Sequence, residues 1–204
     1  NAGIVGAGGA GFPAYIKLKA RAEIYLVNGA ECEPLLKVDQ QIAERDAALL
    51  VRGLALAMEA TQAKEGIIAL KAKYKAAIEA ITPLLPSNMR IHILKDVYPA
   101  GDEVITIWMA TGRRVPPAGL PLDVGIVVSN IQTLINVAKA MDHDQPVVDR
   151  VLTVTGAVKN PITLTLPIGA TYRDALNLAG GLTIPEAKTA FIDGGPMMGK
   201  LLTS

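Results

Sequence analysis

The sequence predicts an α/β fold: a mostly parallel sheet with helices on both faces, followed by a small α+β domain. Short apolar runs alternate with helical segments up to about residue 141, which is typical of strand–helix–strand units. After Pro146 the pattern changes to alternating apolar and polar residues, which indicates a hairpin. The 204 residues are 50% hydrophobic and 19% charged, which is enough apolar material for a core.

The first predicted domain, residues 1–146, contains four strands and the helices between them. Its strands are continuous apolar runs, as expected for strands buried on both faces, and they cover residues 23–28, 66–70, 90–94 and 124–128. Its helices have apolar residues at helical spacing and cover residues 39–61, 74–81, 102–111 and 131–141. This alternation predicts strands that run parallel to one another.

The second predicted domain, residues 147–204, has the order strand, strand, helix, strand. Two alternating segments separated by a turn predict a hairpin, and a short helix and a last strand follow it. These four elements cover residues 150–158, 162–166, 171–179 and 190–192. The order is compatible with a β-grasp.

Composition excludes several classes of function. Lys and Arg number 20 against 19 Asp and Glu, and the net charge of +1 argues against non-specific binding to nucleic acid or to anionic membranes. No apolar run reaches the roughly 18 residues that span a bilayer, so we expect no direct membrane insertion. The single cysteine, Cys32, excludes a disulfide framework and a thiolate cluster made by this chain alone. We therefore expect a reducing, cytoplasmic setting.

The segment GAGGAGFP, residues 6–13, indicates an anion site. Glycines adopt positive φ and let backbone N–H groups surround an anion, and a helix beginning near Pro13 or Ala14 would direct its positive end toward a phosphate. Gly6, Gly8 and Gly11 match a dinucleotide fingerprint, but the next strand ends in Asn28 and not in the acidic residue that binds ribose. A glycine-rich turn that serves only packing remains the alternative.

Three further polar clusters follow predicted strands. They are NGAECEP at residues 28–34, YPAGDE at residues 98–103 and SNIQT at residues 129–133. Ligands of open α/β sheets bind at the carboxyl ends of the strands, so together these clusters predict a binding site. Helix capping by Asp102 and Asn130 is the alternative for the second and third clusters.

The remaining chemically active side chains are expected to be structural. The negative charges of Glu31 and Glu33 would disfavour a thiolate at Cys32, so we expect Cys32 to be a small buried residue and not a nucleophile. His92 lies within a predicted strand, and the turn around His143 supplies no complete set of metal ligands. The GGPMMG segment, residues 194–199, indicates a tight loop whose methionines serve packing.

These motifs, in this order, resemble the flavin-binding subunit of respiratory complex I and, more closely, its RnfC-type relatives. The segments GAGGAGFP, NGAECEP, YPAGDE and GGPMMG carry the resemblance, which extends over essentially the whole chain. Less specific segments such as ALKAKY, residues 69–74, make the chain most similar to the RnfC-like cobalamin reductases. The resemblance implies a Rossmann-like domain that binds FMN and NADH over residues 1–146. It also implies a β-grasp module of the soluble-ligand-binding (SLBB) type over residues 147–204.

The resemblance also implies which residues bind cofactors. Those implied to line the flavin phosphate and ring are Gly6, Gly8, Gly9, Gly11, Lys17, Asn28, Gly101, Asp102, Glu103, Asn130 and Thr133. Phe12 and Glu33 match positions that meet NADH, and Glu31 and Glu33 would bind ribose hydroxyls and disfavour NADPH. This chain departs from the complex I motif at Ala30, Asp102 and Ser129, where the motif has an acidic residue, Glu and Asn.

The implied function is oxidation of NADH by an FMN-containing electron-transfer subunit. Electrons would pass to iron–sulfur clusters in parts of the parent protein outside these residues, or to a redox partner protein, and no residue needs to act as a general base. We expect this chain to be a piece of a longer protein, located in a membrane-associated complex or in a microcompartment. A non-catalytic scaffold with a degenerate nucleotide site and a flavin-free NAD(P) dehydrogenase are the alternatives.

Overall fold

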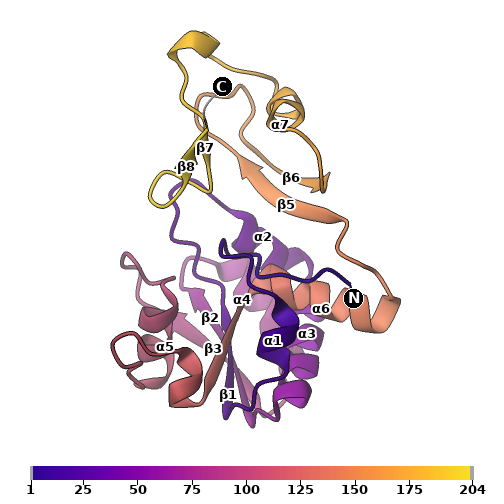
Figure 1. Cartoon of the computed structure of the whole chain (residues 1–204), viewed down its shortest axis with the longest axis vertical. Coiled ribbons are helices and arrows are strands. Elements are labelled where there is room, and N and C mark those ends of the chain that lie inside the picture. The colour runs from indigo at the N-terminus through magenta and orange to yellow at the C-terminus, as the bar shows by residue number, and fades with distance from the viewer. Residues whose placement is uncertain (1, 203–204) are drawn as a thin grey trace. The chain divides into compact units, whose positions relative to one another are not determined.

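We describe the chain from a computed structural model that covers residues 2–202 (Figure 1). The chain divides into two compact units, each described separately below. The first unit contains the residues up to Cys32 together with Asp39–Val147. The second unit contains Glu33–Val38 and the residues from Val148 onward.

The first unit is built on one parallel sheet of four strands, as the sequence predicts. Its strands are β1 (Ile24–Asn28), β2 (Glu65–Lys71), β3 (Met89–Leu94) and β4 (Ile126–Asn130), and their order in the sheet is β3-β2-β1-β4. The chain thus moves from β1 outward to β3 and then returns to place β4 on the other side of β1. Neighbouring strands β1 and β4 are therefore the point where the direction of winding reverses.

Helices cover both faces of this sheet. They are α1 (Ala14–Leu18), α2 (Val38–Arg45), α3 (Ala47–Thr61), α4 (Lys75–Ile81), α5 (Glu103–Thr111) and α6 (Ile131–His143), with 3₁₀ turns η1 (Thr82–Leu84) and η2 (Pro121–Val124). Figure 1 shows α5 on one side of the sheet and α1, α3 and α6 on the other. Ile107 and Ala110 of α5 share a buried cluster with Ile24 and Leu26 of β1. Because strand residues alternate between faces, Tyr25 and Val27 belong to the opposite face.

Several element boundaries differ from the sequence prediction, and in the first unit two of these differences have a clear local cause. The single helix expected over residues 39–61 is two helices, α2 and α3, because Asp46 has a non-helical backbone with φ −112°. The fourth strand begins two residues later than expected, because Val124 belongs to η2 and Gly125 then takes a left-handed conformation at φ 72°. Both differences come from local backbone conformations that an apolar pattern does not show.

Helices α3 and α6 pack with their backbones close together. Gly53 lies in the middle of α3, and a Cβ added there would lie 2.0 Å from the carbonyl oxygen of Leu134 on α6. Around this contact the side chains of Leu50, Leu54 and Leu134 are completely buried. The absence of a side chain at Gly53 therefore sets how closely α6 approaches α3.

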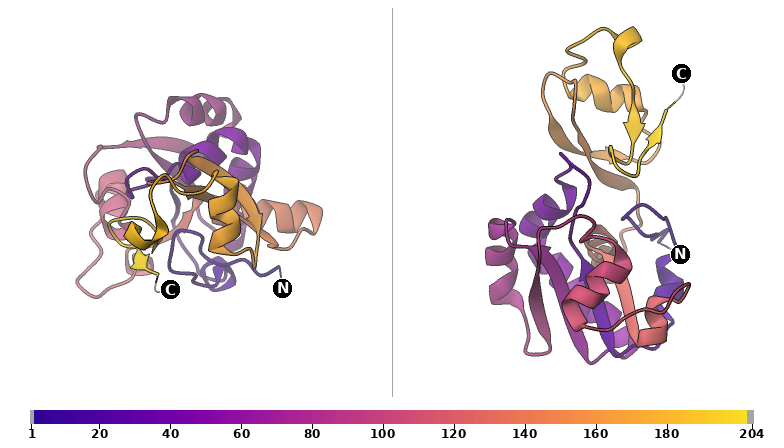
Figure 2. Two further views of the ribbon diagram at one scale, coloured as in Figure 1. Left: turned by 90° about the horizontal axis from the view of Figure 1, so that it is seen from above. Right: turned by 90° about the vertical axis from the view of Figure 1, so that its left-hand side faces the viewer.

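The second unit contains the predicted hairpin, with β5 (Asp149–Val154) antiparallel to β6 (Ile162–Pro167). Helix α7 (Tyr172–Leu178) begins at Thr171 with a capping box, in which Thr171 and Asp174 satisfy one another's backbone N–H groups. Figure 2 shows α7 alongside the hairpin. The turn η3 (Glu186–Lys188) and a two-residue pair of strands, β7 (Ile192–Asp193) and β8 (Lys200–Leu201), complete the unit.

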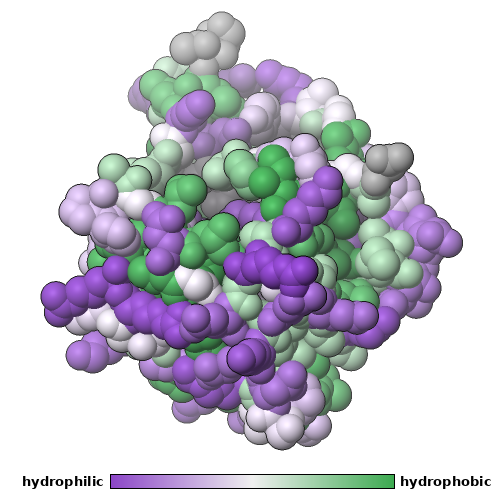
Figure 3. Space-filling view, turned by 60° about the horizontal axis from the view of Figure 1, so that its bottom comes forward, coloured by the Kyte–Doolittle hydropathy of each residue, from purple (hydrophilic) through white to green (hydrophobic). Residues whose placement is uncertain are grey.

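Hydrophilic and hydrophobic residues are interleaved on the face shown in Figure 3. The sequence as a whole has nearly balanced charges, with 20 basic and 19 acidic side chains. Within residues 2–202, no helix combines the length and apolar character that crossing a membrane requires.

Candidate functional site

The carboxyl edge of β1 and β4 is where the predicted site residues gather. Asn28 ends β1, Asn130 ends β4, and the parallel register aligns these two residues directly. This edge is also the point where the winding of the sheet reverses, which is where open α/β sheets bind ligands. The topology thus brings together two asparagines that lie far apart in the sequence.

The glycine-rich segment folds into a closed loop at this edge. An isolated bridge pairs Val5 with Pro13, and the N–H of Gly6 donates to the carbonyl of Phe12 at 2.8 Å. Gly9 and Gly11 have φ values of 123° and 63°, which residues with a side chain rarely adopt. Among the described residues no strand of the sheet precedes this segment, whereas a dinucleotide fingerprint follows directly after one.

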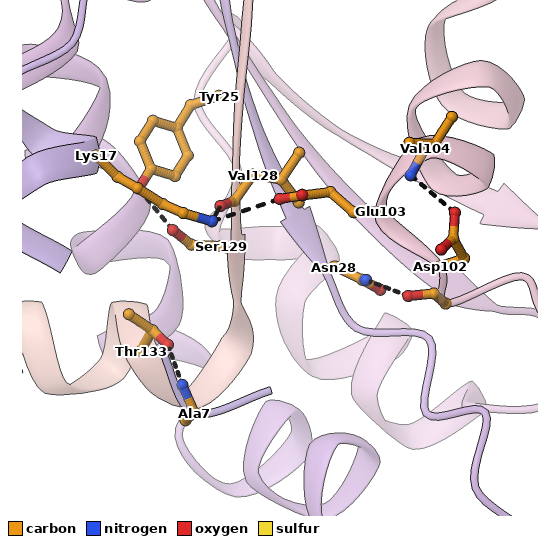
Figure 4. A network of polar contacts seen from close by, with 11 residues as sticks. Ala7, Lys17, Tyr25, Asn28, Asp102, Glu103, Val104, Val128, Ser129 and Thr133 are labelled. Carbon is orange, nitrogen blue, oxygen red and sulfur yellow. Dashed lines mark hydrogen bonds and ion pairs between the residues drawn. The ribbon is translucent and has the colours of Figure 1, made fainter. Parts of the chain in front are cut away.

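The loop lies against the first turn of α6. The N–H of Ala7 donates to the Thr133 hydroxyl at 3.0 Å (Figure 4), and a Cβ added to Gly8 would lie 3.4 Å from the Cβ of Asn130. Helix α1, which follows the loop directly, has only five residues, whereas α6 has 13. The glycines therefore lie against the N-terminus of α6, in addition to that of the short helix α1 that the sequence suggested.

Asn130 has both polar atoms of its side chain occupied. Its carbonyl oxygen accepts the N–H of Gln132 at 2.8 Å, which confirms the predicted helix cap. Its amide nitrogen donates to both carboxylate oxygens of Asp39, at 2.9 and 3.1 Å. Asp39 is buried and fixes the orientation of the amide, a role that the sequence analysis missed because nothing in the local pattern around Asp39 points to it.

Lys17 and Glu103 form a second group at the same edge. The Lys17 ammonium donates to the carbonyl of Val128 at 2.7 Å and lies 3.4 Å from the Glu103 carboxylate (Figure 4). The side chains of Lys17 and Glu103 are 32% and 42% exposed, so this ion pair contributes little to stability. Lys17 also lies 6.0 Å from the centre of the Phe12 ring, which is itself exposed.

Asn28 connects the end of β1 to the loop before α5. Its amide nitrogen donates to the carbonyl of Gly101 at 2.8 Å (Figure 4). Its oxygen accepts the N–H of Ala30 at 3.1 Å. Asp102 then caps α5 by accepting the N–H groups of Val104 and Ile105, both at 3.0 Å, which confirms the predicted cap.

Cys32 differs from its predicted role. Its side chain is partly exposed and not buried, and its sulfur accepts the N–H of Gly101 at 2.8 Å. The interpretation as a small buried residue is therefore wrong, because Cys32 is partly exposed. No motif signals this contact, since it joins two loops that follow different strands.

Glu33 lies in the second unit and not with the residues described above. Its carboxylate accepts the backbone N–H groups of Met197 and Met198, at 2.8 and 2.7 Å. Gly195, at φ 98°, leaves the space this requires, because a Cβ there would lie 2.5 Å from the Glu33 carboxylate. The two methionine side chains are 51% and 80% exposed, so the prediction that they serve packing is wrong.

Two tyrosines that the sequence analysis did not single out lie next to site residues. The Tyr25 hydroxyl lies 2.8 Å from that of Ser129 (Figure 4), and burial raises the pKa of Tyr25 to about 12 although this hydrogen bond opposes the rise. Burial, followed by the negative charge of Glu31, raises the pKa of Tyr74. Both phenols are therefore neutral hydrogen-bonding groups at neutral pH.

His92 lies on β3, where burial and then the charge of Arg90 lower its pKa. In the part of the chain that the structure describes, no group of three or more His, Cys, Asp or Glu side chains could hold a metal ion.

Comparison with known proteins places this chain in a family. The chain matches the Nuo51 FMN-binding domain over residues 1–139 and the SLBB domain over residues 151–201. The chain therefore belongs to the Nuo51 FMN-binding family, with an SLBB domain after the FMN-binding domain. This result confirms the resemblance to the complex I flavin subunit and the predicted fold class.

Similar proteins specify the branch of the family. The cobalamin reductase PduS of Salmonella typhimurium is 63% identical over 203 residues, which is 100% of this chain and 45% of that protein. A component of the sodium-translocating ferredoxin:NAD+ oxidoreductase complex of Acetobacterium woodii is 39% identical over 206 residues, 98% of this chain and 46% of that protein. The chain thus spans about half the length of the curated relatives it matches.

A solved structure shares the fold. The crystal structure of an NAD+-reducing NiFe-hydrogenase in the H2-reduced state matches with a TM-score of 0.71 and 27% sequence identity. The match covers 89% of this chain and 38% of the hydrogenase chain.

Proposed function

We propose that the first unit binds FMN at the carboxyl edge of β1 and β4. We further propose that the chain is the NADH-oxidising, electron-transfer part of an RnfC-type oxidoreductase. The observation that carries this proposal is the glycine loop held on the first turn of α6 by the contact between Ala7 and Thr133. The family match and the similarity to the cobalamin reductase PduS support it.

The residues at this edge fit the phosphate of FMN. Gly8 leaves the side of Asn130 uncovered, and a side chain at this position would fill that space. The partial positive charge at the N-terminus of α6 attracts anions, and the glycine loop adds backbone N–H groups. Gly6, Gly8, Gly9, Gly11, Asn130 and Thr133 would hold the phosphate end, with the Lys17 ammonium at the same edge.

Other residues at the edge fit the flavin ring and NADH. Asn28, Gly101, Asp102 and Glu103 would lie beside the ring, and the exposed ring of Phe12 would stack against the nicotinamide. When bound, FMN accepts a hydride from NADH and releases the electrons singly. The protein's part is to bind, orient and exclude water, and no side chain has to remove a proton.

The acceptor of these electrons in our proposal is an iron–sulfur centre or a redox partner outside this chain. An iron–sulfur cluster usually requires four cysteine thiolates, and this chain has one cysteine. The relatives' names, which include a reductase and a component of a larger complex, support a role within an assembly. Glu31 remains our proposed contact for NADH, whereas the Glu33 carboxylate is bound to the backbone N–H groups of Met197 and Met198.

Titration of FMN into the purified chain, followed by quenching of flavin fluorescence, tests the binding proposal. The wild-type chain should quench saturably. Thr133→Val removes the acceptor for the Ala7 N–H while keeping the shape of the side chain, and we expect roughly tenfold weaker binding. Thr82→Val makes the same change at an exposed position, where the hydroxyl contacts only its own helix, and should leave binding unchanged.

Three outcomes would contradict parts of the proposal. If wild-type protein does not quench at high FMN concentration, the scaffold interpretation replaces it. If Thr133→Val binds as tightly as wild type, the phosphate does not lie on α6. If FMN binds but anaerobic NADH does not bleach its absorbance, the chain binds flavin without oxidising NADH.

A further inference from the structure

The loop before α5 lies unusually close to the segment after β1. A Cβ added to Gly101 would lie 2.1 Å from the carbonyl oxygen of Ala30 and 2.9 Å from the sulfur of Cys32. The first of these neighbours is backbone and cannot rotate away. Only glycine therefore permits the two loops to approach in this way.

The peptide between Ala100 and Gly101 is held at both of its polar atoms. Its carbonyl oxygen accepts the Thr106 hydroxyl at 2.7 Å, and its N–H donates to the sulfur of Cys32 at 2.8 Å. The carbonyl of Gly101 itself accepts the Asn28 amide at 2.8 Å. The side chains of Asn28 on β1, Thr106 on α5 and Cys32 in a loop thus determine the orientation of two consecutive peptide groups.

The hydrogen bond to Cys32 is more open to chemical change than the hydrogen bond to Thr106. Thr106 is completely buried on α5, so its hydroxyl is protected, whereas Cys32 is partly exposed in its loop. A thiol sulfur is a weak acceptor, and a methyl group in its place accepts nothing. Loss of the sulfur would leave the Gly101 N–H to rotate or to seek water.

We propose that Cys32 is a positioning residue of the flavin site. Its sulfur holds the Gly101 N–H and thereby keeps residues 98–103 in one conformation beside the proposed ring site. Cys32 acts through Gly101 and does not itself contact FMN. This inference rests on the proposed function, because the ring site includes Gly101 and its neighbours.

The test compares three variants by FMN affinity, by the visible circular dichroism of bound FMN and by amide hydrogen exchange of Gly101. Cys32→Ala removes the acceptor, so we expect roughly fivefold weaker FMN binding, an altered dichroism spectrum and faster exchange of the Gly101 amide. Cys32→Ser restores an acceptor, and all three readouts should return to within about twofold of wild type. Val97→Ala, an exposed change in the same loop, should leave them unchanged.

The outcomes separate this inference from the proposed function. If wild type binds FMN and Cys32→Ala matches it in affinity, spectrum and exchange, the inference is wrong while the flavin site stands. If Cys32→Ser behaves like Cys32→Ala, the sulfur acts through packing and the inference is also wrong. If wild type does not bind FMN, both proposals fail, whatever the exchange of Gly101 shows.

Discussion

Substitution of Gly53 by alanine is the sharpest test of how the first unit is packed. In an exposed helix interior, alanine is more favourable than glycine by about 1 kcal/mol. At Gly53, however, the new Cβ would lie 2.0 Å from the carbonyl oxygen of Leu134 and 2.6 Å from its carbonyl carbon, where ordinary contact begins at 3.4 Å. Both atoms are backbone, so helices α3 and α6 must move apart.

The expected magnitude follows from these opposing effects. Overpacking of a core costs about 1–3 kcal/mol, and a backbone neighbour places Gly53→Ala at the upper end. After the gain in helix propensity, we expect a net loss of about 2 kcal/mol, or about 30-fold in the folding equilibrium. With a urea dependence of about 2 kcal/mol per molar, the unfolding midpoint should fall by about 1 M.

Urea unfolding followed by circular dichroism measures this change. Ala60→Gly, at the exposed end of α3, is the control and should lose less than about 1 kcal/mol. Leu134 directly follows Thr133, so Gly53→Ala should also weaken FMN binding by displacing the first turn of α6. A midpoint for Gly53→Ala equal to or above that of wild type would refute the close approach of the two helices.

Two further predictions concern pH. The pKa of Tyr25 is raised from 10.0 to about 12 by burial, so its contribution to stability is complete below pH 10 and is lost as the pH rises toward 12. Tyr25→Phe should reduce the loss of unfolding free energy between pH 10 and pH 12, measured by urea unfolding. An unchanged dependence of this free energy on pH would exclude Tyr25 as its source. The Arg52 guanidinium holds the pKa of Asp142 below 3.8, so the stabilisation present above pH 3.8 is lost as the pH falls through the lowered pKa. Arg52→Ala should therefore reduce the acid dependence of stability, and an unchanged acid titration would contradict this.

Much of the fold could be predicted because it depends on local patterns. Continuous apolar runs identify the four strands of the parallel sheet, and helical spacing identifies α4, α5 and α6. The caps at Asp102 and Asn130 were also predictable, since a cap joins a side chain to an N–H only two or three residues later. The break at Asp46 was not, because one non-helical residue leaves the apolar spacing on either side intact.

The candidate site was predicted as a set of residues but not as a set of contacts. Motif order, through the family resemblance, placed Lys17, Glu103 and Thr133 in one site. The structure adds that Lys17 meets Glu103 and that Thr133 accepts the N–H of Ala7. It also adds Asp39, whose carboxylate orients Asn130 although no motif includes it.

Reading the amino-acid sequence was enough to establish the alternation of strands and helices, the caps and the membership of the family. Each of these depends on residues close together along the chain, or on motifs in a fixed order. The folded chain was needed to establish that Cys32 accepts the Gly101 N–H and that Glu33 binds the backbone of Met197 and Met198. These contacts join residues separated by a whole strand–helix unit or more, so they depend on sheet order and loop geometry that no local pattern encodes.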